Sequence, residues 1–188
     1  MLTREEIRLQ FENKTVCLVG NSVKLFDNKN NGSLIDSYDT VCRFNKGISK
    51  LGDPCYGNRF DVLFYAHSNV VPMAWRTNPT QFGETYLIQT SIKGRQPERL
   101  FNKHKSYIVP ITTITNLRDR LKLTKRQVPS TGIVAIDFVL SFNPKKIVLF
   151  GFDWKKNPTF YAKPIDVEPH NYQNEELYIN SLKNIEIH

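Results

Sequence analysis

The stretch VCLVGNS at residues 16–22 decides the fold class, together with VPSTGIVAIDFVL at residues 128–140. The first is a short apolar run that ends in Gly-Asn-Ser, where glycine permits a tight turn and the polar side chains offer short hydrogen-bond donors. The second opens an apolar helix with Pro-Ser-Thr-Gly, so its first turn would present unpaired N–H groups. Either feature alone is ordinary, but the two together indicate backbone-rich segments facing one anion.

Apolar runs without polar alternation recur along the chain and predict strands buried on both faces, as parallel sheets require. Strands are expected at 15–19, 40–44, 61–65, 85–89, 106–109 and 146–150. Helices are expected after a Thr3–Glu6 capping box, at 113–123, from Ser130 to about residue 141, and at 175–182. This alternation predicts a three-layer α/β/α Rossmann-like fold with a mostly parallel sheet, in one domain over residues 1–188.

Polar segments follow several of the predicted strands, and they read GNS, RFN, AHSN and GFD. Ligands of parallel sheets bind outside the carboxyl ends of the strands, so these segments are expected to surround a nucleotide-type site. The polar stretch at 27–33 is expected to be a loop.

Composition indicates a soluble protein. The chain has 188 residues and a net charge of +8, which favours anionic ligands without selecting among nucleotides, nucleic acid, acidic glycans or a membrane surface. It contains no run of about 20 apolar residues and no secretory signal at its start. The three cysteines, Cys17, Cys42 and Cys55, form no CxxC pair, so we expect no zinc and a reducing, cytoplasmic location.

Individual residues of the site are expected from the same segments. Gly20, Asn21 and Ser22 would form one wall, with Asn45 reaching the same ligand, although each could also be a simple turn residue. Ser130, Thr131 and Gly132 would seat a phosphate or carboxylate, with Arg126 adding charge, although most helix caps bind no ligand.

A histidine is the usual general base near neutral pH, and His170 is the first candidate because Glu175 follows it at the start of the last helix. His67 is a competing candidate. Asp36 and Asp39 in IDSYD are read as turn or hydrogen-bonding residues, because no apolar strand leads into them, and no catalytic metal is expected.

These segments, taken in order, resemble the sialyltransferases of glycosyltransferase family 29. Residues 16–47 look like the long sialylmotif, residues 128–153 like the short one, and His170 with Glu175 like the very short HxxxxE motif. The GNS, RFN and PSTG segments are also similar to the bacterial sialyltransferases of family 42. The resemblance spans about residues 14–182 and implies the sialyltransferase-type, GT-A-like variant of the fold.

The resemblance implies a cytidine monophosphate (CMP) sugar as donor and no metal or other cofactor. Asn21 and Asn45 would hold its phosphate and ribose, and His170 would be the general base. Residues 130–132 would bind the donor phosphate and the sugar carboxylate, and Asn69 is a looser candidate for the nucleotide.

Three departures from family 29 are visible. The short motif has no cysteine, so the family's usual disulfide is not expected. The third motif, here NPTFYAKP, has no histidine, and Tyr161 is the nearest replacement. The chain starts without the membrane anchor of the Golgi enzymes, which is why a bacterial or viral origin is favoured.

The sequence therefore predicts a metal-independent, inverting transferase that moves sialic acid or a related acidic sugar from a CMP-sugar to a glycan hydroxyl. Its partners would be the donor and a glycan acceptor, without nucleic acid or stable membrane insertion. Peripheral membrane contact and oligomeric state stay open. Three alternatives also stay open: a 3-deoxy-octulosonate transferase with a CMP donor, a magnesium-dependent pterin-type pyrophosphokinase, and a non-catalytic nucleotide- or glycan-binding module.

Overall fold

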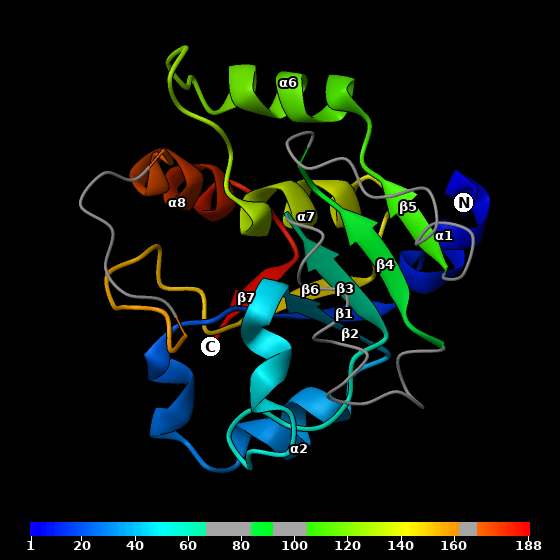
Figure 1. Ribbon diagram of the computed structural model, residues 1–188, viewed down its shortest axis with the longest axis vertical. Helices are drawn as coiled ribbons and strands as arrows, with labels where there is room; N and C mark the ends of the chain where they lie inside the picture. Colours follow the sequence, from blue (N-terminus) through cyan, green and yellow to red (C-terminus); the bar gives the residue numbers. More distant parts are fainter. Residues whose placement is uncertain (67–83, 92–104, 162–168) are drawn as a thin grey trace.

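The computed structural model describes residues 1–66, 84–91, 105–161 and 169–188. Figure 1 shows a twisted central sheet with helices on both sides. The elements are α1 (Arg4–Phe11), β1 (Thr15–Val19), the 3₁₀ helix η1 (Val23–Asp27), α2 (Asn31–Asp36), β2 (Thr40–Phe44), the 3₁₀ helix η2 (Asn45–Lys50), β3 (Val62–Tyr65), β4 (Tyr86–Gln89), β5 (Ser106–Ile108), α6 (Ile111–Arg120), α7 (Thr131–Leu140), β6 (Lys146–Phe150), α8 (Tyr172–Asn180) and β7 (Ile185–Ile187).

All seven described strands are parallel, in the order β5-β4-β3-β2-β1-β6-β7. The predicted bounds of β1, β2 and β6 are confirmed, because continuous apolar runs in a doubly covered sheet leave little choice of register. A mostly parallel sheet was expected, whereas every described pair of neighbouring strands is parallel. The edge strand β7 was not predicted, since IEI is too short for its pattern to stand out.

Two helical layers cover the sheet, as predicted. Alternate strand residues point to opposite faces, so Val16 and Leu18 of β1 pack with α1, α6, α7 and α8, while Cys17 and Val19 pack toward η1 and α2. The same alternation sends Cys42 of β2 to the α7 side. All three cysteines are free thiols, and burial raises the pKa of Cys17 to about 12.

Helix α7 is the central helix of its layer. Every residue from Ile133 to Val139 is buried, and Ser130 caps its first turn, as predicted. Its one buried acid, Asp137, accepts hydrogen bonds from Arg120 of α6 at 2.7 Å and from the Tyr178 hydroxyl of α8 at 2.8 Å. The Asp137 carboxylate therefore links α6 and α8 to α7.

The helix boundaries differ from the predictions where tertiary contacts decide them. Residues 31–33, expected in a loop, begin α2, because Gly32 packs so closely on Pro54 that only glycine fits. Helix α6 begins directly after Pro110, earlier than expected, and α8 begins at Tyr172 after an Asn171 cap.

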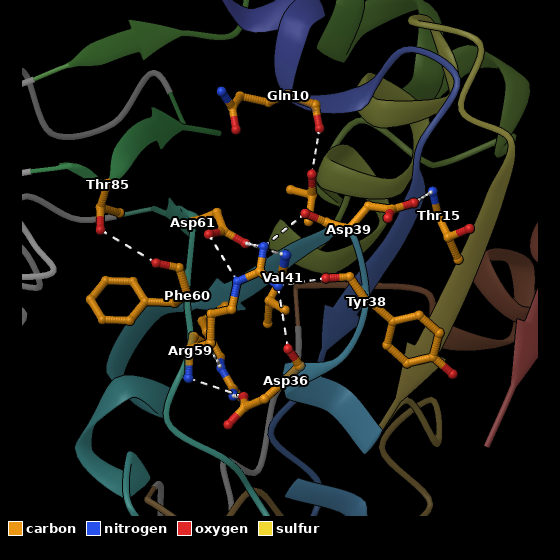
Figure 2. A network of polar contacts seen from close by, with 12 residues as sticks. Gln10, Thr15, Asp36, Tyr38, Asp39, Val41, Arg59, Phe60, Asp61 and Thr85 are labelled. Carbon is orange, nitrogen blue, oxygen red and sulfur yellow. Dashed lines mark hydrogen bonds and ion pairs between the residues drawn. The ribbon is translucent and has the colours of Figure 1, made fainter. Parts of the chain in front are cut away.

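A polar network ties the amino ends of the strands together (Figure 2). Asp39 accepts a hydrogen bond from the Thr15 backbone N–H at 2.8 Å, and Asp61 accepts one from Val41 at 2.7 Å. Asp36 accepts from the N–H of Asn58 at 2.7 Å. The interpretation of Asp36 and Asp39 as hydrogen-bonding residues is confirmed.

Arg59 is the centre of this network (Figure 2). Its guanidinium donates to the carbonyls of Tyr38 at 2.6 Å and Asp39 at 2.8 Å, and it pairs with Asp61 at 3.0 Å. Charged donors are thus placed on carbonyls that follow the end of α2.

We expect Arg59→Ala to lower the free energy of unfolding by about 2 kcal/mol, because several hydrogen bonds from one charged donor are lost. Lys24→Ala removes the same charge from an exposed ion pair with Asp27 and is expected to cost less than about 0.5 kcal/mol. Urea unfolding at neutral pH measures both. Equal losses in the two variants would contradict the role assigned to Arg59.

Candidate functional site

A cavity of about 280 Å³ lies at the carboxyl ends of β1, β2 and β6, opposite the polar network. Segments that are far apart in the sequence line it. They are Gly20, Asn21, Ser22, Phe44, Asn45, Ser130, Thr131, Gly132, Gly151, Phe152, Asp153, Trp154, Lys155, Thr159, Tyr161, His170, Tyr172 and Glu175. The GNS, RFN, PSTG and GFD segments and the HxxxxE pair therefore meet around one space.

The loop after β1 is fixed against the loop after β6. Gly20 donates its N–H to Phe150 at 2.6 Å, and Ser22 donates its N–H to Gly151 at 3.2 Å. A Cβ on Gly20 would collide with the Gly151 carbonyl oxygen, so the turn predicted from the sequence requires glycine at this position.

Asn21 and Asn45 connect strand ends. The Asn21 amide nitrogen donates to the Phe44 carbonyl at 3.3 Å and to the Tyr161 hydroxyl at 3.2 Å. Asn45 has a left-handed backbone, with φ of 47°, and its Oδ1 accepts from the Ala66 N–H at 3.0 Å. Both amides hold the cavity wall together, which a sequence pattern cannot reveal.

The N-terminus of α7 is bound by Glu175. The Ser130 N–H donates to Glu175 Oε1 at 2.8 Å, and the Ser130 hydroxyl donates to Oε2 at 2.7 Å while accepting from Ile133 N–H. Both Ser130 donors are therefore occupied. Thr131 and Gly132, the first two residues of α7, also line the cavity, and N–H groups in the first turn of a helix have no partner within the helix.

Glu175 is 1% exposed, and burial raises its pKa to about 7, although the hydrogen bonds from Ser130 lower it. The carboxyl group therefore changes charge near neutral pH at the edge of the cavity. The HxxxxE pattern identified Glu175 from the sequence but did not predict this contact with Ser130.

His170 lies next to this helix end. Its Nδ1 is 2.8 Å from the Val128 carbonyl oxygen, and Val128 donates its N–H to Pro169. A carbonyl can only accept, so in the neutral ring Nδ1 carries the proton and Nε2 has the lone pair. The ring is thus held in the tautomer that a general base needs.

Asp153 organises a strained turn that sequence reasoning missed. Its carboxylate accepts from the Ser22 hydroxyl at 2.6 Å and from the N–H of Lys155 and Asn157 at 3.1 Å each. Trp154 and Lys155 have left-handed backbones, with φ of 55° and 61°. Such strain is costly without glycine and occurs where the surroundings enforce it.

The turn brings Lys155 to the cavity, and Lys155 is the only lysine or arginine among the described residues that line it. Tyr161 lies across from the loop after β1, and burial raises its pKa to about 12, so its hydroxyl is protonated at neutral pH. Its oxygen accepts from Asn21, which leaves the O–H hydrogen for another acceptor.

One predicted site residue, Arg126, does not join this group. Arg126 is exposed and outside the cavity lining, because the hydrogen bond from Gln127 N–H to the Thr124 carbonyl turns the chain at the surface. Its expected charge contribution is not supported by this position. Asn69 and the competing base His67 lie outside the described residues.

Comparisons with protein-family models and with curated proteins gave no match. Solved structures do match. A mammalian sialyltransferase bound to Gal-β-1-3GalNAc-ortho-nitrophenol is 21% identical, with a TM-score of 0.61 over 93% of this chain and 69% of that chain.

Two structures from Campylobacter jejuni are also similar. The monofunctional α-2,3-sialyltransferase Cst-I is 13% identical, with a TM-score of 0.59 over all of this chain and 77% of that one. The sialyltransferase CstII in complex with CMP is 14% identical, with a TM-score of 0.61 over 94% and 79%. The fold implied by the sequence resemblance is therefore confirmed as the one that mammalian and bacterial sialyltransferases share.

Within the described ranges, no helix is long and apolar enough to cross a bilayer. The same ranges contain no group of three His, Cys, Asp or Glu side chains arranged to hold a metal ion. The expectation that the protein works without a metal stays a prediction.

The raised pKa of Glu175 predicts a specific pH dependence of stability. The folded state holds the proton up to about pH 7, whereas a free glutamic acid loses it near 4.5. Stability relative to Glu175→Gln should therefore fall as the pH rises between these values, by on the order of 3 kcal/mol.

Urea unfolding of both proteins from pH 4.5 to 8 measures this difference. Glutamine is a suitable replacement because its amide can still accept from the Ser130 N–H and donate to the hydroxyl. Parallel stability profiles for the two proteins would show that Glu175 titrates normally.

Proposed function

We propose that the protein is a CMP-sugar-dependent glycosyltransferase that transfers sialic acid or a related acidic sugar to a glycan hydroxyl. The supporting observation is that Asn21, Thr131, Tyr161 and His170 line a single cavity at the carboxyl ends of the strands. Such cavities are where α/β proteins bind nucleotides. The similar CstII structure is a complex with CMP.

The anionic part of the donor would bind at the N-terminus of α7. The N–H groups of Thr131 and Gly132 and the partial positive charge of the helix favour a phosphate or carboxylate there. Gly132 lets the Phe152 ring pack closely against this helix end, since a Cβ would lie 2.9 Å from that ring. Ser130 would support this end through Glu175 rather than bind the donor directly.

Transfer would proceed with His170 as the base. The acceptor hydroxyl gives its proton to Nε2 while its oxygen forms a bond to the anomeric carbon. The bond from that carbon to the phosphate oxygen breaks, and CMP leaves. Attack on the face opposite the phosphate inverts the anomeric centre.

Negative charge gathers on the departing phosphate during this step. The Tyr161 hydroxyl and the Lys155 ammonium are the groups that would stabilise it. Preorganised donors of this kind usually make the largest catalytic contribution. Tyr161 would thus take the place of the histidine that the third motif lacks.

The donor class is tested by nucleotide binding. We expect CMP to raise the melting temperature more than UMP, AMP or GMP, because a ligand stabilises the state it binds. Equal shifts for all four, or none, would reject a cytidine donor.

The contact proposed between Lys155 and the donor phosphate is tested by titration with CMP. Lys155→Met is expected to weaken CMP binding about tenfold, the scale of a lost hydrogen bond from a charged donor. Lys156→Met is the matched control, because Lys156 pairs with Glu176 of α8 and does not line the cavity. Isothermal calorimetry should show the loss only in the first variant.

The base is tested with His170→Asn, whose amide can still donate to the Val128 carbonyl. Turnover of CMP-sialic acid should fall about 10²–10⁴-fold, the usual contribution of a general base, while the CMP dissociation constant stays within about twofold. Unchanged turnover would remove His170 from the mechanism. Absence of turnover and of donor hydrolysis in the unmodified protein would favour the non-catalytic binding module instead.

A further inference from the structure

A pair of polar atoms behind the cavity wall takes no part in the mechanism above. Asn21 Oδ1 and the Tyr56 hydroxyl oxygen are both buried, and neither has a hydrogen-bond partner among the described residues. One is an acceptor and the other a donor. Unmade hydrogen bonds away from water are costly, so such atoms require a physical reason.

Gly47, in η2, brings the two atoms to one place. A Cβ on this residue would overlap Asn21 Oδ1 and lie 2.5 Å from the Tyr56 hydroxyl oxygen. Both atoms therefore face the space above the Gly47 Cα, and only a residue without a side chain leaves that space open.

Tyr56 is held rigidly in this position although it is absent from the cavity lining. The guanidinium of buried Arg43 lies 4.0 Å from its ring centroid. Phe26 stacks on the ring at 6.4 Å, and Phe160 meets it edge-on at 5.7 Å. Burial raises the pKa of the Tyr56 hydroxyl, so it is a donor at neutral pH.

The amide of Asn21 is held less tightly. Its nitrogen donates over 3.3 Å to Phe44 and 3.2 Å to Tyr161, both at the long end for hydrogen bonds. A single donor directed at Oδ1 would fix which end of the amide faces each partner. Hydrogen bonds in functional sites often tighten only when the ligand binds.

We propose that Tyr56 is a positioning residue for the donor site, whose hydroxyl pairs with the Asn21 amide oxygen when the nucleotide occupies the cavity. The inference rests on the proposed function. Tyr56 acts through Asn21 and does not touch the ligand. Gly47 is required because any larger residue would separate the two groups.

Tyr56→Phe tests this directly, because it removes one oxygen atom. That oxygen makes no hydrogen bond of normal geometry among the described residues and has only the nearby Arg43 side chain beside it, so the melting temperature of the free protein is expected to change little. The CMP dissociation constant should increase about tenfold, which corresponds to about 1.4 kcal/mol. A purely structural tyrosine would show the reverse pattern.

Tyr178→Phe is the matched control. The Tyr178 hydroxyl donates to Asp137 at 2.8 Å and accepts from Arg120 at 2.9 Å, away from the cavity. Its removal should lower the melting temperature and leave CMP affinity unchanged. Gly47→Ala is a second, independent variant and should weaken CMP binding as Tyr56→Phe does.

Calorimetric titration with CMP and thermal unfolding give both readouts for each variant. Weaker CMP binding in Tyr56→Phe without a loss of melting temperature supports the inference. An unchanged dissociation constant in Tyr56→Phe, with CMP bound by the unmodified protein, overturns it and leaves the proposed function intact. If the unmodified protein does not bind CMP, the proposed function fails and the inference fails with it.

Discussion

The close approach of Gly20 to Gly151 is the constraint on which the site depends. These residues end the neighbouring strands β1 and β6, and the backbone atoms at the two turns leave no room for a side chain on Gly20. Gly151 has φ of 66°, a conformation that favours glycine. Because the turns touch, the Ser22 hydroxyl reaches Asp153, and Asn21 and Lys155 line the same cavity.

A second long-range contact completes the cavity. Glu175 of α8 accepts both donors of Ser130, and so places the last described helix against the start of α7. It also places His170 beside the same helix end, with the Val128 carbonyl fixing its tautomer. Burial raises the pKa of Glu175 to about 7, so much of it is neutral at physiological pH.

Much of the fold could be predicted because the strands are buried on both faces. Their apolar runs are unambiguous, and polar residues after them identify the carboxyl edge of the sheet. The grouping of the site was less accessible to sequence reasoning. Nothing in the sequence indicates that Trp154 and Lys155 adopt left-handed backbones, because that conformation is imposed by Asp153. The hydrogen bonds from Ser130 to Glu175 join residues 45 positions apart, so a local helix-cap pattern could not predict them.

The polar network and the cavity lie at opposite ends of the strands. Arg59 and the carboxylates around it bind backbone groups at the amino ends (Figure 2). The cavity lies at the carboxyl ends. A strand of five residues places about 16 Å between them. Exposed charges that far apart interact weakly at physiological ionic strength. A change of charge in the cavity wall is therefore expected to leave the polar network at the amino ends, and the stability it contributes, nearly unaltered.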